Sequence, residues 1–372
     1  TTIHRAEAAS ISYPTFFDHS GGKYLRQDAL SRREFVDALD KLVQETSNLA
    51  DQIEKFEDRS EDMSRLLARA NAIAGRLSDW RDEARADLIR WADVSANGWQ
   101  LHATPLSVAE IFKKQTEASA RSWIFTSATL SAGGDFSLFT RQLGLEAAKS
   151  QSWASPFDYA NAGRIYVPRN LPPPNSPEHT QSVIAEALEL VTISGGRAFL
   201  LFTSLRALRQ CAEVFPQLLK DRNLDFPVLT QNDAPKGELL RRFRSLGNAV
   251  LIGSQSFWEG VDVAGDALSL VVIDKLPFAS PDDPVLAARM KHLEEGGGSP
   301  FMDWQVPQAA MSLKQGAGRL IRSETDRGVL AICDDRLVTK GYGKILRASL
   351  PPMPFTRDRG DVAAFFVGHQ NI

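Results

Sequence analysis

Ala198-Phe199-Leu200-Leu201-Phe202-Thr203-Ser204 is an apolar run of strand length that ends in two hydroxyl side chains. Three further apolar runs, residues 249–253, 268–273 and 328–333, are separated from it and from one another by helical patterns. Continuous apolar strands that alternate with helices are typical of a parallel sheet covered on both faces. The sequence therefore predicts an α/β fold for this part of the chain.

A stretch rich in glycine and arginine, Leu313-Lys314-Gln315-Gly316-Ala317-Gly318-Arg319-Leu320-Ile321-Arg322, precedes the last of these strands. On a helix, Gln315, Arg319 and Arg322 would share one face, because they stand at positions i, i+4 and i+7. Guanidinium groups at fixed spacing can hold phosphate and neutralise charge on a transferring phosphoryl group. The alternative interpretation is a solvated basic helix that tolerates a pair of glycines.

A second polar stretch, Ser254-Gln255-Ser256-Phe257-Trp258-Glu259-Gly260-Val261-Asp262-Val263, follows the strand at 249–253. Ligand sites of α/β sheets lie at the carboxyl ends of strands, so contact residues are expected here. Gly260 permits close approach of a backbone, and Asp262 can accept a hydrogen bond from a ribose hydroxyl. The hydroxyls of Ser254 and Ser256 can donate to phosphate oxygens.

The N-terminal third of the chain has helical periodicity. Apolar residues recur at steps of three, four or seven over residues 31–56 and 63–88, which predicts two long antiparallel helices. Residues 89–94 and 99–103 alternate around an Asn97-Gly98 turn, which predicts a β-hairpin.

Ser122-Trp123-Ile124-Phe125-Thr126-Ser127-Ala128-Thr129-Leu130 follows the hairpin as another apolar run. We expect a strand here, with Ser127 and Thr129 at its carboxyl end and therefore placed for contacts. A plain strand end without a functional role is the alternative.

The amino-acid composition limits the classes of function that this chain can have. The chain has 372 residues, with 43 Lys and Arg against 46 Asp and Glu, so a nucleic-acid partner would need a local basic groove. Its two cysteines are too few for a disulfide framework, and we expect no metal site. No apolar run has the roughly 18 residues of a membrane span. We expect a cytoplasmic protein without membrane contact and, because the chain starts at Thr1, a piece of a longer one.

The ordered motifs resemble motifs III to VI of a superfamily 2 helicase. They are Ser127-Ala128-Thr129-Leu130, Leu201-Phe202-Thr203-Ser204, Trp258-Glu259-Gly260-Val261-Asp262-Val263 and the stretch Gln315–Arg322. Flanking stretches resemble the DinG/YoaA branch of the XPD-like DNA helicases, the YoaA side most closely. These are Ser155-Pro156-Phe157-Asp158-Tyr159, Ile273-Asp274-Lys275-Leu276-Pro277-Phe278 and Ser280-Pro281-Asp282-Asp283-Pro284.

The resemblance implies a RecA-like motor domain with a parallel sheet, preceded by other segments. Residues 1–87 would be a helical arch-like insertion, residues 88–131 the last strands of RecA-like domain 1, and residues 132–372 RecA-like helicase domain 2. It also implies ATP and Mg²⁺ as cofactors of the whole protein, with ATP bound between the two motor domains.

The resemblance further implies roles for single residues. Arg322, helped by Arg319, would be the arginine finger, and Gln315 would sense or position the triphosphate. Residues that couple nucleotide to DNA would be Glu259, Gly260 and Asp262, with a relay through Ser127, Ala128 and Thr129. Residues along a single-stranded DNA track, contacting its backbone, would be Thr203, Ser204, Ser254 and Ser256.

Several parts of such a helicase have no counterpart in this sequence. It contains no G-x-x-x-x-G-K-[ST] phosphate loop and no Asp-Glu-Ala-His box; Asp82-Glu83-Ala84-Arg85 lies in a helical pattern without a buried strand before it. The four cysteines that hold the family's 4Fe-4S cluster are also missing. All three lie N-terminal to the insertion in the family, so we expect a C-terminal half that does not hydrolyse ATP alone.

Two functions follow as hypotheses. The first is the motor half of a monomeric ATP-dependent DNA helicase with 5′-to-3′ polarity, acting on single-stranded or forked DNA in repair or replication; the resemblance suggests a clamp-loader subunit as a protein partner. The alternative is a non-catalytic module, derived from a helicase, that binds DNA or a partner. An unrelated nucleotide-binding enzyme is disfavoured, because no G-x-G-x-x-G follows any expected strand.

Overall fold

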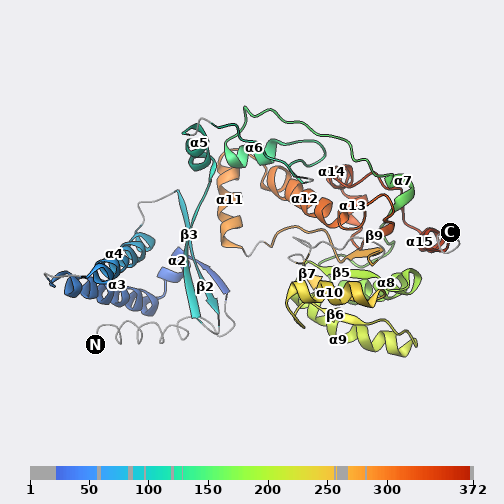
Figure 1. The fold of residues 1–372 in the computed structure, drawn as a ribbon, viewed down its shortest axis with the longest axis horizontal. Coiled ribbons are helices and arrows are strands. Elements are labelled where there is room, and N and C mark those ends of the chain that lie inside the picture. Colours follow the sequence, from blue (N-terminus) through green and yellow to red (C-terminus); the bar gives the residue numbers. More distant parts are fainter. Residues whose placement is uncertain are drawn as a thin grey trace. The chain divides into compact units, whose positions relative to one another are not determined.

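A computed structural model describes residues 22–56, 60–82, 87–95, 98–118, 121–127, 129–254, 257, 267–280 and 283–368. The chain divides into two compact units. Unit 1 comprises residues 1–115 and 279–300, and unit 2 comprises residues 116–278 and 301–372. The elements of both units are labelled in Figure 1.

Unit 1 combines a helical pair with a small antiparallel sheet. The helices are α2 (Arg26–Leu30), α3 (Arg33–Glu54), α4 (Glu61–Arg81), α5 (Ala109–Glu117, ending just inside unit 2) and α11 (Pro284–Glu295), and the strands are β1 (Gly22–Leu25), β2 (Leu88–Ser95) and β3 (Gly98–Pro105) in the order β1-β2-β3. The predicted helix pair, α3 and α4, and the predicted hairpin, β2 and β3, are therefore confirmed.

The core of unit 1 explains these elements. Phe35 of α3 packs edge to face against Trp80 of α4, with ring centroids 5.9 Å apart, and both are buried. The hydroxyl of Ser60 accepts a hydrogen bond from the Met63 N–H and caps the start of α4. The segment 279–300 also belongs to this unit, and Lys23 Nζ lies 2.9 Å from Asp283 Oδ2, at the start of α11.

Unit 2 contains a seven-stranded sheet in which every neighbouring pair is parallel. Its order is β10-β4-β9-β8-β5-β7-β6. The strands are β4 (Gly163–Tyr166), β5 (Ala198–Phe202), β6 (Val228–Thr230), β7 (Val250–Ser254), β8 (Leu270–Ile273), β9 (Gly328–Ile332) and β10 (Phe355–Thr356). The four apolar runs predicted as strands are thus β5, β7, β8 and β9, adjacent to one another in the sheet.

Helices cover both faces of this sheet. The described helices of unit 2 are α6 (Ser137–Leu143), α7 (Tyr159–Ala162), α8 (His179–Ser194), α9 (Leu205–Asp221), α10 (Lys236–Leu246), η3 (Pro300–Gln305), α12 (Val306–Ala317), α13 (Arg336–Thr339), α14 (Gly343–Ser349) and α15 (Arg359–Val367). Phe199 and Leu201 of β5 share a core with α10, α12 and α14, whereas Leu200 and Phe202 share one with α8, α9 and α15. The alternation explains why β5 is apolar throughout.

The predicted strand at residues 122–130 is wrong for the part that the structure describes. Residues 121–127 are irregular and exposed, with 84 % of Ile124 and 45 % of Trp123 accessible to solvent. A strand needs a hydrogen-bonded neighbour, and none of the described strands pairs with this segment. Its apolar composition therefore does not make a strand here.

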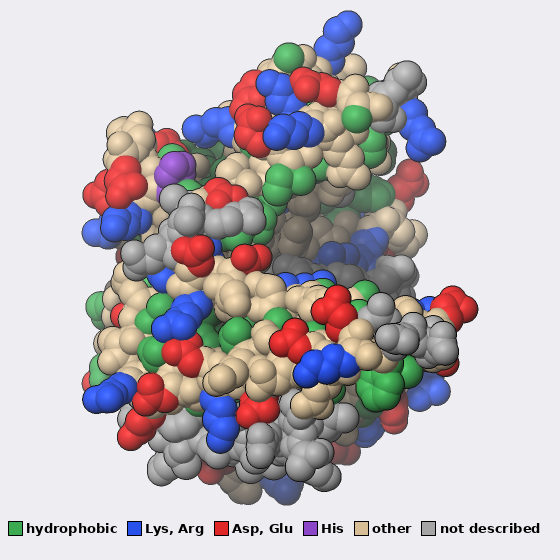
Figure 2. Space-filling model, turned by 90° about the vertical axis from the view of Figure 1, so that its left-hand side faces the viewer, with side chains coloured by type: hydrophobic (Ala, Val, Ile, Leu, Met, Phe, Trp, Pro, Cys, Tyr) green, Lys and Arg blue, Asp and Glu red, His purple; other side chains and the backbone are tan. Residues whose placement is uncertain are grey.

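The surface is mixed in charge. Acidic and basic side chains are interspersed over the face shown in Figure 2, as the small net charge of −3 leads one to expect. No helix among the described residues is long and apolar enough to cross a membrane. In the same part of the chain, no group of three or more His, Cys, Asp or Glu side chains could hold a metal ion.

Candidate nucleotide and nucleic-acid site

Polar residues gather where the central strands of unit 2 end. Because the strands are parallel, β5, β7, β8 and β9 end on one side of the sheet, called here the carboxyl edge. Thr203 and Ser204 follow β5, and Ser254 is the last residue of β7. Asp274 follows β8, and Asp334 stands two residues after β9. The sheet topology thus brings together residues far apart in sequence.

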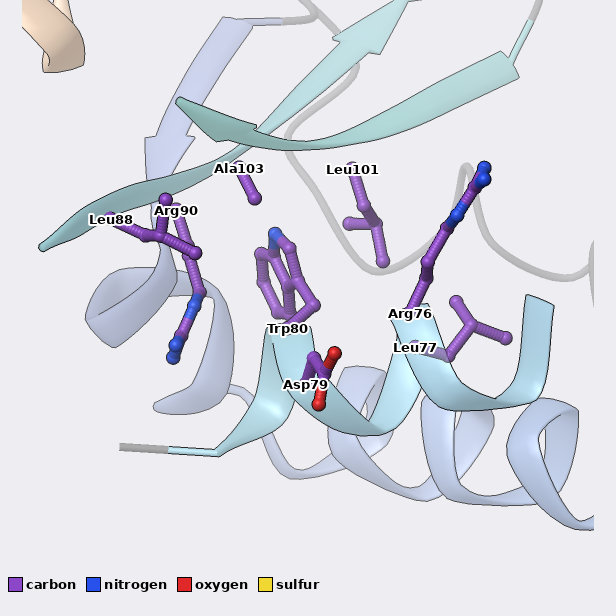
Figure 3. Close-up of a pocket in the computed structure, with 8 residues that line it drawn as sticks. All are labelled: Arg76, Leu77, Asp79, Trp80, Leu88, Arg90, Leu101 and Ala103. Carbon is purple, nitrogen blue, oxygen red and sulfur yellow. The ribbon is translucent and has the colours of Figure 1, made fainter. Parts of the chain in front are cut away.

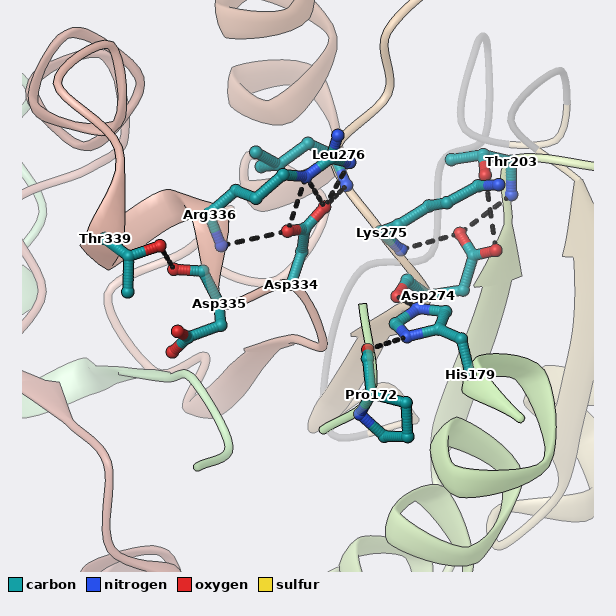
Figure 4. A network of polar contacts seen from close by, with 10 residues as sticks. All are labelled: Pro172, His179, Thr203, Asp274, Lys275, Leu276, Asp334, Asp335, Arg336 and Thr339. Carbon is teal, nitrogen blue, oxygen red and sulfur yellow. Dashed lines mark hydrogen bonds and ion pairs between the residues drawn. The ribbon is translucent and has the colours of Figure 1, made fainter. Parts of the chain in front are cut away.

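Asp274 accepts several hydrogen bonds at this edge (Figure 4). Its carboxylate is 3 % exposed and accepts hydrogen bonds from the Thr203 N–H at 2.9 Å and the Lys275 N–H at 2.8 Å, both on Oδ1. The Thr203 hydroxyl lies 3.2 Å from Oδ2. Burial raises the pKa of Asp274 to about 6, although these hydrogen bonds oppose the shift.

The next strand end is held in a similar way. Asp334 Oδ2 accepts from the Leu276 N–H at 2.9 Å, and Arg336 Nη2 lies 2.7 Å from the same oxygen. The His179 ring contacts the segment that follows β8. Its Nδ1 lies 2.8 Å from the Pro172 carbonyl oxygen, and its Nε2 lies 3.0 Å from the Asp274 carbonyl oxygen (Figure 4). The segment after β8 is therefore fixed from the β9 side and from α8.

Two of the three serine hydroxyls predicted to contact DNA, those of Ser204 and Ser254, already have partners within unit 2. Ser204 Oγ accepts from the Ala207 N–H at 3.2 Å and caps α9. Ser254 is buried, and its N–H and hydroxyl both donate to Gln231 Oε1, at 2.7 and 2.8 Å. Their local role is structural, so any phosphate contact must use their remaining hydrogen-bonding capacity.

A second cluster joins two of the predicted motifs. Gln315 Nε2, on α12, lies 3.5 Å from Thr129 Oγ1. The Thr129 N–H donates to Ser127 Oγ at 3.1 Å, and the two hydroxyls are 3.3 Å apart. The structure therefore brings Ser127, Thr129 and Gln315 together, although 186 positions separate Thr129 from Gln315.

The prediction that Gln315, Arg319 and Arg322 share one helix face is wrong. Helix α12 ends at Ala317 with Gly318 as its C-cap, so both arginines lie in the loop that leads to β9. The buried carboxylate of Asp326 holds this loop, since its Oδ2 accepts from the Arg322 N–H at 2.7 Å. Glycine has a low helix propensity, and the acceptor at Asp326 offers the backbone an alternative to further helix.

Five predicted site residues lie outside the described part of the chain: Ala128, Ser256, Glu259, Gly260 and Asp262. Conversely, sequence reasoning assigned no role to Gln231, Asp274 or Asp326, which organise the predicted residues. Asp274 did carry a signal, because a carboxylate directly after an apolar strand must either reach solvent or find donors.

Unit 1 contains a separate hollow between α4 and the sheet (Figure 3). Its volume is about 290 Å³, and it is lined by Arg76, Leu77, Asp79, Trp80, Leu88, Arg90, Leu101 and Ala103. The Trp80 indole N–H donates to the His102 carbonyl oxygen at 3.0 Å, which fixes the ring in its wall. None of the predicted site residues lines this cavity.

Comparison with known proteins defines the class. Residues 187–353 match the family described as Helicase C-terminal domain. This range includes β5, β7, β8, β9 and the loop between α12 and β9 that carries Arg319 and Arg322, called here the arginine loop. Much of unit 2, including its carboxyl edge, is therefore similar to a helicase C-terminal domain.

The relatives narrow the class further. The chain is 45 % identical over 318 residues to the ATP-dependent DNA helicase YoaA of Escherichia coli K12, which covers 85 % of this chain and 49 % of YoaA. It is 42 % identical over 268 residues to the ATP-dependent helicase DinG of Mycobacterium tuberculosis H37Rv, which covers 71 % of the chain and 40 % of DinG. The resemblance to the DinG/YoaA branch is confirmed, and the chain spans about half the length of the curated relatives it matches.

Solved structures agree in fold. Xpd4 of S. tokodaii matches 95 % of this chain and 74 % of its own, with a TM-score of 0.52 and 13 % identity. An apo XPD structure matches 95 % and 71 %, with a TM-score of 0.54 and 16 % identity. The predicted fold class, an α/β protein with the RecA-like parallel sheet of XPD helicases, is confirmed.

Proposed function

We propose that this chain is the C-terminal motor half of an ATP-dependent DNA helicase. The observation that carries the proposal is the contact between Gln315 and Thr129, which joins the predicted motifs III and VI within hydrogen-bond reach. Identity of 45 % to a DNA helicase over 85 % of the chain supports the same assignment. In this proposal Arg319 and Arg322 reach a nucleotide that a second, phosphate-loop-bearing half also holds.

The residues of this chain fit only part of an ATP site. Two arginines after α12 can meet the charge of a triphosphate, and the Gln315 amide nitrogen can donate a hydrogen bond to it. Mg²⁺ would neutralise charge on the phosphates; we assign it no ligand from the described residues. We therefore propose that the phosphate loop, the Mg²⁺ ligands and any 4Fe-4S cluster belong to the other half, and that this chain alone is inactive as an ATPase.

The DNA would cross the carboxyl edge of unit 2. A translocating motor contacts the sugar-phosphate backbone and not the bases, and hydroxyls such as those of Thr203 and Ser204 suit that task. We propose single-stranded or forked DNA as the substrate, with 5′-to-3′ movement. A clamp-loader partner, a monomeric state and a cytoplasmic location remain predictions.

The direct test is binding of this chain to a fluorescent oligothymidylate, measured by anisotropy at about 50 and about 200 mM salt. Backbone contacts release counterions, so the affinity should fall at least roughly tenfold over this range. Arg209→Ala removes an exposed cation from α9, the helix that Ser204 caps, and should weaken binding. Arg33→Ala removes an exposed cation from unit 1 and should bind as the unaltered chain does. Binding that stays flat with salt would contradict a phosphate track.

The alternative, a non-catalytic module that binds DNA or a partner, is favoured by one observation. The sequence contains no phosphate loop in any of its 372 residues. The two functions separate when a protein containing both halves is assayed, because only the motor hydrolyses ATP in response to DNA.

A further inference from the structure

The Thr203 hydroxyl has one proton, and the protonation state of Asp274 determines the direction in which that proton points. Both backbone donors of the network, the N–H groups of Thr203 and Lys275, end on Asp274 Oδ1. The other oxygen, Oδ2, faces the Thr203 hydroxyl alone among these contacts, at 3.2 Å. Oδ1 thus remains an acceptor in every state, whereas Oδ2 can either accept a proton or carry one.

Two arrangements satisfy the same geometry. When Asp274 is ionised, Thr203 Oγ1 donates its proton to Oδ2 and presents only lone pairs to its surroundings. When Asp274 is protonated, Oδ2–H donates to Thr203 Oγ1 across the same 3.2 Å, and the threonine proton is released for another acceptor. A phosphodiester is an anion that only accepts hydrogen bonds, so it is repelled in the first arrangement and bound in the second.

We propose that Asp274 is a positioning residue for DNA binding: a backbone phosphate at Thr203 is bound when Asp274 takes up a proton and turns the Thr203 hydroxyl toward the phosphate. The inference rests on the proposed function, since it needs DNA to cross the carboxyl edge. One proton moves from solvent to Asp274 Oδ2, and no covalent bond is made or broken.

The burial of Asp274 favours its protonated state. The carboxylate is almost fully buried, and its pKa of about 6 lies near neutrality. An anionic phosphate nearby disfavours a second negative charge and so favours the proton further. Asp274 follows β8, which lies between β5 and β9, and His179 of α8 contacts its carbonyl oxygen.

Other titratable or charged groups face this position from the neighbouring elements. Lys275 follows Asp274 on its own segment and favours the ionised carboxylate. His179 of α8 contacts the Asp274 carbonyl oxygen. After β9, Cys333 is a buried thiol whose pKa is raised by burial, and Asp334 is neutralised by Arg336 at 2.7 Å. His179 is an ionisable side chain in direct contact with this segment, so it needs its own control.

The test measures affinity of the chain for oligothymidylate, at constant salt, from about pH 5.5 to about pH 7.5. The unaltered chain should lose roughly twentyfold in affinity as the pH rises, because a carboxyl with a pKa near 6 must be reprotonated on binding. Asp274→Asn should bind at pH 7.5 as the unaltered chain does at low pH, and should lose most of the dependence. Its amide nitrogen donates to Thr203 as the protonated carboxyl does, while its oxygen still accepts both backbone N–H groups.

Three further variants sharpen the result. Thr203→Val should bind weakly and lose the same part of the pH dependence, whereas Thr203→Ser, which keeps a hydroxyl, should retain it. His179→Gln should also retain it. Thermal unfolding confirms that each variant is folded, and calorimetry in buffers of different ionisation enthalpy should show proton uptake on binding that Asp274→Asn lacks.

The outcomes are distinguishable. An Asp274→Asn variant that keeps the full pH dependence overturns the inference, as does binding by the unaltered chain that depends on salt but not on pH. If the unaltered chain shows no salt-dependent binding at any pH, the proposed function fails, and the inference fails with it.

Discussion

Asp274 and Gln231 perform the same task at neighbouring strand ends. Each side chain satisfies both the backbone N–H and the hydroxyl of a residue at the carboxyl edge, Thr203 in one case and Ser254 in the other. A buried acceptor that serves two donors at once costs several hydrogen bonds when it is removed. Single residues at this edge therefore control both stability and the orientation of possible ligand contacts.

Asp274 should make stability depend on pH in a direction unusual for a carboxylate. Its pKa of about 6 in the folded chain lies above the ordinary value of 3.8, so the folded state holds a proton that the unfolded chain releases between these values. The contribution to stability is fully present below about pH 4 and is lost as the pH rises through about 6. Asp274→Asn should thus gain roughly 1–3 kcal/mol relative to the unaltered chain between about pH 4 and pH 7.5.

Urea unfolding at both pH values measures this difference. The comparison must be between the two proteins, because other carboxylates act in the opposite sense; the N–H of Ser137, for example, lowers the pKa of Asp135. A stability difference that is the same at both pH values would show that Asp274 has no raised pKa.

Gln231 follows the short edge strand β6, yet its side chain should contribute substantially to the stability of the fold. Gln231→Ala leaves the Ser254 N–H and hydroxyl without their acceptor in a buried setting, which costs about 1–3 kcal/mol. Ser254→Ala removes only the hydroxyl and keeps the backbone contact, so its cost should be smaller. Chemical denaturation of both variants checks the order, and equal costs would contradict this account of the Ser254 backbone.

Sequence patterns placed the hydroxyls at this edge but could not supply their partners. A strand that ends in Thr203-Ser204 is visible in the sequence, and so are the neighbouring apolar runs. The bond between Thr203 and Asp274 joins residues 71 positions apart and depends on which strands are neighbours. That order is a property of the assembled sheet and is not encoded in any local period.

At the scale of elements, the arginine loop between α12 and β9 packs closely against the sheet at Gly328. A Cβ at this position would lie 2.4 Å from Leu320 Cδ1 and 2.6 Å from the carbonyl oxygen of Ser269. Backbone cannot move aside as a flexible side chain can, so only glycine permits this approach. The loop that carries Arg319 and Arg322 is thereby packed directly against the first residue of β9.

Gly328→Ala should accordingly destabilise unit 2 by roughly 1–3 kcal/mol, because it forces Leu320 and the adjoining backbone apart. Gly341→Ala is the matched control, since nothing lies within 4 Å of a Cβ there, and it should change stability by less than about 0.5 kcal/mol. Thermal unfolding compares the two. If Gly328→Ala proved as neutral as its control, the close packing of this loop would be refuted.

Periodicity predicted the long helices, the hairpin and the central strands because each buries its own apolar side. It failed where the outcome depends on something outside the segment. Residues 122–130 have the composition of a strand but no described neighbour to pair with, and the helix expected through Arg322 stops at Gly318. A strand needs its ladder, and a helix end depends on local capping as well as on apolar spacing.

At the scale of the whole molecule, we propose that the chain supplies one part of a motor. It matches 49 % of the length of YoaA and 40 % of DinG, and its sequence contains stretches that resemble motifs III to VI but no phosphate loop. An arginine finger contributes to catalysis only when another element holds the nucleotide, so activity should need both parts. This split is the central claim about function.

The most direct measurement is DNA-stimulated ATP hydrolysis by this chain and by a protein that contains both halves, each with and without Arg322→Ala. The account predicts no hydrolysis by this chain, DNA-dependent hydrolysis by the two-half protein, and a loss of about a thousandfold or more in its kcat on Arg322→Ala. Arg327→Ala, an exposed arginine of the same loop, serves as the control and should keep activity. Hydrolysis by this chain alone that disappears on Arg322→Ala would contradict the account, because the chain would then contain a phosphate-binding site of its own.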